Sequence, residues 1–205
     1  MHMEWKTFSR RLLIAAAGML MLPAAHEAMA SSLGNANLTV TASVTSYVSI
    51  AFSGTNVSSA VAGNSSDSYT ATATLAFGSF NYGSSTTSTG ATVTDVSSLG
   101  SCTGGCIEVS QPVTLTVTAY DLNSTGYTIS ASLAAADNVN GWALGTTSQT
   151  LTNSTGTTIS GPGQGGTFAY NTGEPLTVYL AVPESNGSSV ETSVSNTIDM
   201  VLTAQ

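Results

Sequence analysis

The sequence predicts an all-β fold, an antiparallel β-sandwich of immunoglobulin-like type, with a jelly roll as the alternative. Three observations support this prediction. Apolar and polar residues alternate in many short segments, which is the two-residue period of a half-buried strand. Turn-forming residues recur at intervals of about 8–15 residues, as expected of a sandwich. No segment has the 3.6-residue period of a convincing amphipathic helix.

The first 30 residues have the features of a bacterial secretory signal peptide. Three basic residues (Lys6, Arg10 and Arg11) precede an apolar run over residues 12–22, and Ala28-Met29-Ala30 has small residues where a signal peptidase cleaves. The apolar run is shorter than the roughly 20 residues of a membrane-spanning helix. We therefore predict that residues 1–30 are removed, that the product is secreted or on the cell surface, and that the mature chain has no integral membrane segment.

The charge distribution argues against several classes of function. All basic residues and both histidines lie at or before position 26, whereas nine of the eleven acidic residues follow position 30. Such a chain cannot neutralise phosphates, so neither nucleic acid nor an anionic membrane surface is expected as a partner. It also lacks imidazole, amine and guanidinium groups for catalysis or metal binding. We predict a non-enzymatic protein without a cofactor or metal, whose folding depends little on pH between about 3 and 7.

The first predicted strand covers residues 35–44. Leu38, Val40, Ala42 and Val44 lie on one face, and polar residues lie on the other. Residues 31–46 are thus predicted as an N-terminal extension with a candidate donor strand, and residues 47–205 as the sandwich domain. The apolar row must be covered either by its own domain or by a neighbouring copy, and the pattern alone leaves both arrangements open.

The remaining segments predict a total of about eight to ten strands. They cover residues 47–52, 69–77, 91–96, 113–120, 127–133, 151–159, 176–182 and 195–204. Pro112 is expected to mark the start of the strand 113–120. Residues 123–126 are expected to join that strand to 127–133 as a hairpin. The glycine-rich residues 161–166 are predicted as a flexible loop.

Cys102 and Cys106 are predicted to form a structural disulfide at the tip of a loop. Two cysteines in an exported chain usually pair, and Gly104 and Gly105 give the short ring the backbone freedom that it needs. A redox-active pair normally has two intervening residues and a nearby basic group, both of which are missing here. Two cysteines without histidine are also too few for a metal site.

Other candidate sites are weaker. Trp142 is predicted as a core residue, and in the alternative it is a ligand-stacking platform together with Tyr82 or Tyr170. Residues 137–141 are predicted as a turn, because a calcium loop would carry further carboxylates. An acid-active carboxyl hydrolase would need a pair of carboxylates, but no local motif selects one. Its candidates are Glu108, Asp121, Glu174, Glu184, Glu191 and Asp199.

Two segments also carry a resemblance to known families. Residues Leu75-Ala76-Phe77-Gly78-Ser79-Phe80 resemble a Leu-x-Phe-Gly-x-Tyr segment, and residues 36–44 occupy the place of a donor strand. In these two features the chain resembles secreted pilin subunits, in particular those of the spore coat protein U-like and chaperone–usher fimbrial families. The six-residue segment is typical of the spore coat protein U-like family. In such subunits a sandwich short of one strand is completed by the N-terminal strand of the next subunit.

The resemblance implies a structural subunit of an extracellular filament (a pilus or fimbria) or of a surface coat, with roles in cell adhesion and biofilm. The implied partners are copies of the same chain in a homopolymer, a periplasmic chaperone and an outer-membrane assembly protein. The alternative is a monomeric secreted adhesin or carbohydrate-binding β-sandwich. In that case Trp142, Tyr82 or Tyr170 would contact the ligand.

Overall fold

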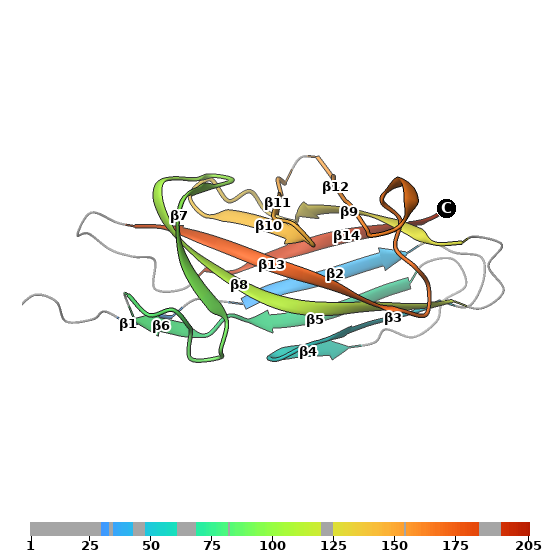
Figure 1. Ribbon diagram of the computed structural model, residues 1–205, viewed down its shortest axis with the longest axis horizontal. Coiled ribbons are helices and arrows are strands. Elements are labelled where there is room, and N and C mark those ends of the chain that lie inside the picture. The colour runs from blue at the N-terminus through green and yellow to red at the C-terminus, as the bar shows by residue number, and fades with distance from the viewer. Residues whose placement is uncertain are drawn as a thin grey trace, which may run out of the picture.

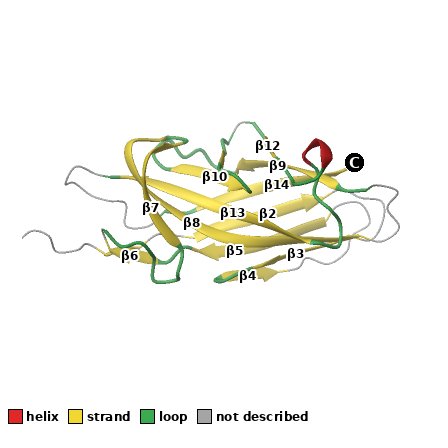
Figure 2. Ribbon diagram, viewed as in Figure 1, coloured by secondary structure: helices red, strands yellow, loops and turns green. Residues whose placement is uncertain are grey.

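The computed structural model describes residues 30–32, 35–42, 48–60, 69–81, 83–119, 125–153, 155–184 and 194–205. Within these ranges the regular structure is β-strand, apart from one turn of 3-10 helix, η1 (Gln164–Gly166) (Figure 2). The predicted all-β sandwich is confirmed. Residues 1–29, which include nearly all of the predicted signal peptide, lie outside the described residues.

The described residues form 14 strands. Their bounds are β1 (Ala30–Ser32), β2 (Asn35–Ala42), β3 (Val48–Ser53), β4 (Val57–Ala60), β5 (Tyr69–Ala76), β6 (Ser79–Asn81), β7 (Thr92–Leu99), β8 (Cys102–Ala119), β9 (Tyr127–Leu133), β10 (Gly141–Gly145), β11 (Gln149–Thr150), β12 (Thr157–Ile159), β13 (Gly173–Pro183) and β14 (Asn196–Ala204). The segments that alternate most regularly in the sequence are among the longer strands, because alternation gives a strand one face to bury.

Two six-stranded sheets make up most of the fold (Figure 1). Sheet I has the order β12-β9-β14-β2-β5-β4. Sheet II has the order β11-β10-β13-β8-β3, and β7 also pairs with β8. The strand pairs within the sheets are antiparallel except β2 and β14, which run parallel. A separate short pair joins β1 to β6.

One hydrophobic core lies between the sheets. In β9 every second residue is buried, and the same holds over most of β8, β13 and β14. The core cluster contains residues from both sheets, such as Leu115 and Leu180 from sheet II and Ile129 and Ile198 from sheet I. Each sheet therefore covers the apolar face of the other, as sandwich architecture requires.

The predicted hairpin between residues 113–120 and 127–133 is wrong. The first segment is the end of β8 in sheet II, and the second is β9 in sheet I. β8 pairs with β13, β3 and β7, whereas β9 pairs with β14 and β12. Both strands have one apolar face, so they pack across the core in opposite sheets instead of joining edge to edge.

Pro112 does not begin a strand but lies inside the 18-residue strand β8. On one side of β8 the pairing with β7 ends at Ser110, and the pairing with β3 begins at Thr114. Pro112 lies at this change of partners. A residue without an N–H group is tolerated within a strand where the hydrogen-bond ladder is interrupted.

Candidate assembly strand

β2 lies inside sheet I, although it comes from the N-terminal part of the chain. It pairs antiparallel with β5, from Asn35 opposite Ala76 to Ala42 opposite Tyr69. On its other side it pairs in parallel with β14, the last strand (Figure 1). In this single chain, the strand of the predicted extension 31–46 is therefore an integral part of the sheet formed by residues 47–205.

The apolar face of β2 points into the core. Ala36 and Leu38 are 0% exposed, and Asn37 and Thr39 on the other face are partly exposed. Leu38 lies opposite two buried residues, Ala73 of β5 and Ile198 of β14. Burying a leucine side chain contributes roughly 1.5–3 kcal/mol, so Leu38 is a main anchor of this strand.

Val40 and Ala42 follow Leu38 on the same side of the strand. Val40 lies in register with Ala71 and Met200, and Ala42 with Tyr69 and Leu202. Their side chains lie outside the described part of the structure, as does Val44 entirely. Donation of Leu38, Val40, Ala42 and Val44 to a neighbouring copy stays a prediction.

Removal of β2 would open a slot in the middle of sheet I. β5 pairs with β4 on its other side, and β14 pairs with β9, so each would keep only one neighbour. Unpaired backbone groups on both walls would then require a new strand, as exposed sheet edges do. A second copy of this chain carries a strand with the matching alternation of apolar residues.

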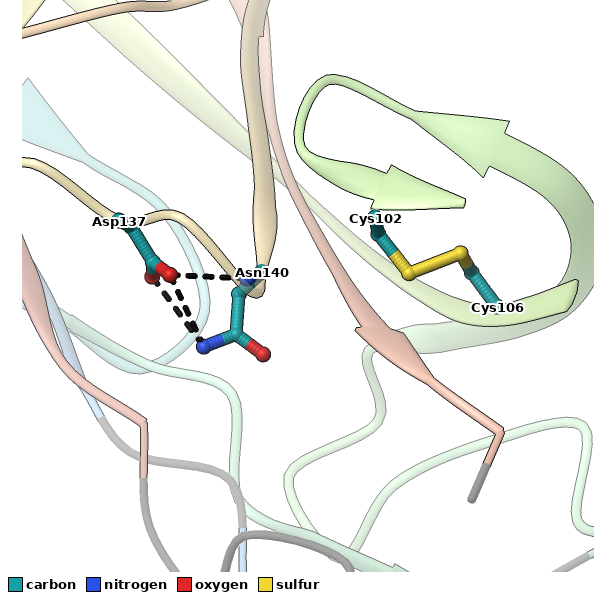
Figure 3. Close-up of a disulfide and its surroundings, with 4 residues drawn as sticks. All are labelled: Cys102, Cys106, Asp137 and Asn140. Atoms are coloured by element: carbon teal, nitrogen blue, oxygen red, sulfur yellow. Dashed lines mark hydrogen bonds between the residues drawn. A yellow bond between two sulfur atoms is a disulfide. The ribbon is translucent and has the colours of Figure 1, made fainter. Parts of the chain in front are cut away.

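Cys102 and Cys106 form the predicted disulfide (Figure 3). Both cysteines lie in β8, and the turn that joins β7 to β8 comes before them, at Gly100 and Ser101. The register with β7 shifts along this stretch, so β8 carries a β-bulge here. Gly104 and Gly105 have φ angles of 83° and 103°, which glycine adopts without strain. The buried disulfide therefore closes a bulge in a strand instead of the tip of a loop.

Trp142 belongs to the core. It is 1% exposed, and its ring lies 6.5 Å from that of Phe77, between centroids. The indole Nε1–H donates to Asp137 Oδ2 at 2.8 Å. The ring face is covered by protein, so Trp142 is not a surface platform for a ligand. Its core role agrees with the first interpretation of the sequence.

The Asp137 carboxylate organises the turn before β10. It accepts hydrogen bonds from the backbone N–H and the side chain of Asn140 (Figure 3). It also accepts one from the backbone N–H of Val139. Burial by itself would raise the pKa of Asp137, but these bonds and that from Trp142 lower it below its ordinary value. The bonds satisfy the carboxylate from within the turn, which agrees with a turn at residues 137–141 and not with a calcium loop.

The other two candidate platforms do not form a shared surface with Trp142 in the described structure. Tyr170 is partly buried and packs against Tyr127, with ring centroids 5.3 Å apart. Tyr82 lies outside the described residues. No ligand-stacking surface is therefore assembled from the residues of this set that the structure describes.

The carboxylates that the structure describes are dispersed. Glu108 lies on the outer face of β8 in sheet II, Asp199 on the outer face of β14 in sheet I, and Glu174 is buried at the start of β13. Burial raises the pKa of Glu108. Among the described residues no group of three or more acidic, cysteine or histidine side chains could hold a metal ion. No helix in the same part of the chain is long and apolar enough to cross a membrane.

Comparisons with known proteins give no relative: no family model matches the sequence, and no curated protein matches it. Function is therefore inferred from the residues of the chain itself. The feature with the clearest functional meaning is β2. The alternation of apolar and polar residues predicted this strand, whereas the strands that pair with β2 on each side could not be predicted from the sequence.

Proposed function

We propose that this protein is a non-enzymatic structural subunit of an extracellular filament or surface coat, and that copies are joined by exchange of β2. The observation that carries the proposal is the position of β2. A strand from the N-terminal part of the chain lies between β14 and β5, where its departure leaves a slot that the same strand of another copy fits.

The composition supports a structural role. After residue 30 the chain has no Lys, Arg or His, so the most common catalytic bases and anion-binding groups are missing. The sequence features of an export signal and the Cys102–Cys106 disulfide fit an oxidising, extracellular setting. The carbohydrate-binding and hydrolase alternatives have no comparable support, because their candidate residues that the structure describes are at least partly buried or lie on different strands. The candidates Tyr82, Asp121 and Glu191 lie outside the described residues.

Strand exchange would preserve the contacts of β2 and change only the chain that provides it. Leu38 of one copy would pack against Ala73 and Ile198 of the next. If each copy gives its strand to one neighbour and receives a strand from a different neighbour, the contact is heterologous and builds an open filament. Residues 43–47 join β2 to β3, and five extended residues span at most about 18 Å. Neighbouring sandwiches would therefore lie close together.

A cysteine pair across β2 and β5 tests the proposal. Asn37 and Thr74 lie directly opposite each other on the outer face, at a distance that a disulfide can bridge. In the full-length variant Asn37→Cys, Thr74→Cys, oxidation should produce a ladder of covalent multimers on a non-reducing gel. The native cysteines are already paired and buried. Negative-stain microscopy of the same sample should show filaments.

The matched control is Asn37→Cys, Ser132→Cys, because β9 does not neighbour β2. This variant should not give the ladder. If the Asn37→Cys, Thr74→Cys protein is cross-linked only within single chains at every concentration, and no filaments form, β2 stays in its own domain and the proposal is wrong. Filaments without intermolecular cross-links would show assembly through another surface, which also contradicts β2 exchange.

A further inference from the structure

One charged residue lies beside β2 in sheet I. Asp199 of β14 is in register with Thr39 of β2 on one side and with Ser132 of β9 on the other. All three residues lie on the outer face of the sheet and are partly exposed. The strands β2, β5 and β14 contain no other charged residue. Asp199 is therefore the only charged side chain on the two strands that border β2.

The chain after the predicted signal peptide has no cation to offset a second carboxylate beside Asp199. No Lys, Arg or His follows residue 26, whereas nine acidic residues follow residue 30. Like charges directly opposite each other on neighbouring strands destabilise the pairing. A threonine hydroxyl carries no charge and can donate a hydrogen bond to a carboxylate. The position in register with Asp199 therefore suits the Thr39 of β2 and disfavours Asp or Glu.

β14 has the same alternation of apolar residues as β2, so β14 of a second copy is a competitor for the slot between β5 and β14. Ile198 is in register with Leu38, and Met200 is in register with Val40. Ile198 and Met200 are buried, as Leu38 is. A second β14 in the place of β2, with its apolar residues in the same register, would put its own Asp199 directly beside that of the receiving copy.

We propose that Asp199 is a specificity-determining residue of this slot. It admits β2, which has Thr39 at the position beside it, and rejects strands with a carboxylate there, including β14 of a second copy. The inference rests on the proposed exchange of β2 between copies. Discrimination between partners uses unfavourable contacts in the wrong pairing as well as favourable contacts in the right one. Because the apolar faces of β2 and β14 are alike, the outer face carries the distinction.

Disulfide trapping between two different full-length chains tests the proposal. The donor chain carries Asn37→Cys and the receiving chain carries Thr74→Cys, because these positions lie opposite each other on β2 and β5. Every donor chain also carries Asp199→Asn, so that a change at Thr39 meets no charge in the donor's own slot. Donors with and without Thr39→Glu compete for a limiting amount of receiving chain, and intact-mass spectrometry separates their mixed dimers.

With Asp199 in the receiving chain, the Thr39→Glu donor should be trapped about two- to fivefold less than the parent donor. The matched control is a Thr41→Glu donor, which has the same net charge but is in register with the uncharged Val201. The Thr41→Glu donor should be trapped nearly as well as the parent donor. This control separates the contact with Asp199 from general repulsion between acidic chains.

Changes in the receiving chain complete the cycle. With Asp199→Asn in the receiving chain the Thr39→Glu donor should be trapped like the parent, and with Asp199→Lys it should be favoured. A purely structural effect of Thr39→Glu on β2 would be the same in all three receiving chains. A peptide of residues 196–204, added as a competitor, should lower the yield of mixed dimer more for the Asp199→Asn receiving chain than for the unmodified one.

The outcomes distinguish this inference from the exchange of β2 itself. No mixed dimer from the parent donor and the unmodified receiving chain would contradict β2 exchange, and with it the role of Asp199. Mixed dimers that form equally well from the parent and the Thr39→Glu donors would leave β2 exchange standing and overturn the role of Asp199. A penalty for Thr39→Glu that persists with the Asp199→Asn receiving chain would overturn it too.

Discussion

At the scale of single residues, the Asp137 carboxylate connects a surface turn to the core tryptophan. It holds the Trp142 Nε1–H and the turn backbone together. Asp137→Ala leaves a buried indole donor unpaired, so we expect a loss of about 2–4 kcal/mol in the free energy of unfolding. Urea denaturation followed by tryptophan fluorescence measures it. Asp95→Ala, at an exposed position in β7, should change stability by less than about 0.5 kcal/mol.

The same carboxylate should make stability depend on pH at the acid end, although no basic side chain pairs with it. This differs from the expectation, drawn from the sequence, of little pH dependence between about pH 3 and 7, because neutral hydrogen-bond donors also shift the pKa of Asp137. The donors to Asp137 are neutral groups, and they lower its folded pKa below the ordinary value of 3.8. The unfolded chain then takes up the proton first as pH falls. The stabilisation by Asp137 is therefore present above about pH 4 and is lost as pH falls through the folded pKa.

The contribution of Glu108 to stability depends on pH in the opposite direction to that of Asp137, because burial raises the pKa of Glu108 in the folded state above 4.5. Its contribution favours the folded state at low pH and is lost as pH rises through the folded pKa. We expect urea midpoints to change little between about pH 6 and 7 and to fall below about pH 4. The fall should be much smaller in Asp137→Asn. An equal fall of the urea midpoint in the wild type and in Asp137→Asn would mean that another carboxylate causes the loss of stability at low pH.

At the scale of elements, Leu38 should determine whether β2 stays in its slot. Leu38→Asp puts a charge at a position that is 0% exposed, so the loss should exceed about 3 kcal/mol. Asn37→Asp, on the outer face of the same strand, should be nearly neutral. A synthetic peptide of residues 35–45 added to Leu38→Asp should restore β circular dichroism, because it can occupy the slot. No rescue at any peptide concentration would contradict an accessible slot.

The disulfide should have a modest effect on the stability of β8. It closes a ring with only three residues between the cysteines, for which the chain-entropy relation gives about 2 kcal/mol. We expect the double substitution Cys102→Ala, Cys106→Ala to lower the unfolding free energy by about that amount. Filament formation should be unchanged, because β2 pairs with β5 and β14, and the disulfide lies in sheet II. Microscopy of the variant checks this second expectation.

The elements differ in how far the sequence could predict them. The buried faces of β2, β9 and β14 could be predicted from the alternation of apolar and polar residues, because the two-residue period of a strand depends only on residues that are neighbours in the sequence. The assignment of β8 and β9 to different sheets depends on pairing with distant strands, and the short connection between them looks like a hairpin. The burial of Glu174 was not predicted, although Glu174 lies on the same face of β13 as the buried residues Leu176 and Val178. The bonds of Asp137 to Trp142 depend on a turn geometry that has no sequence period.

At the scale of the whole molecule, the lack of basic residues gives a direct test of processing. No Lys or Arg follows Arg11, so trypsin has no cleavage site in the predicted mature chain, even when it is denatured. Mass spectrometry of the denatured, trypsin-treated secreted protein should show one intact species that begins at Ser31. Loss of further N-terminal residues, or retention of residues 12–30, would contradict the predicted cleavage position.

The parallel pairing of β2 with β14 also determines how the molecule would bear a pulling force. The two strands point in the same direction, with Ala36 beside Asn196 and Ala42 beside Leu202. Tension between the chain ends would pull β2 toward its amino end and β14 toward its carboxyl end, so the strands would slide lengthwise past each other. All seven residue pairs between them would be loaded together in shear and would not open one after another like a zipper. Such a geometry would suit the proposed filament subunit, in which the contact between β2 and β14 would carry tension.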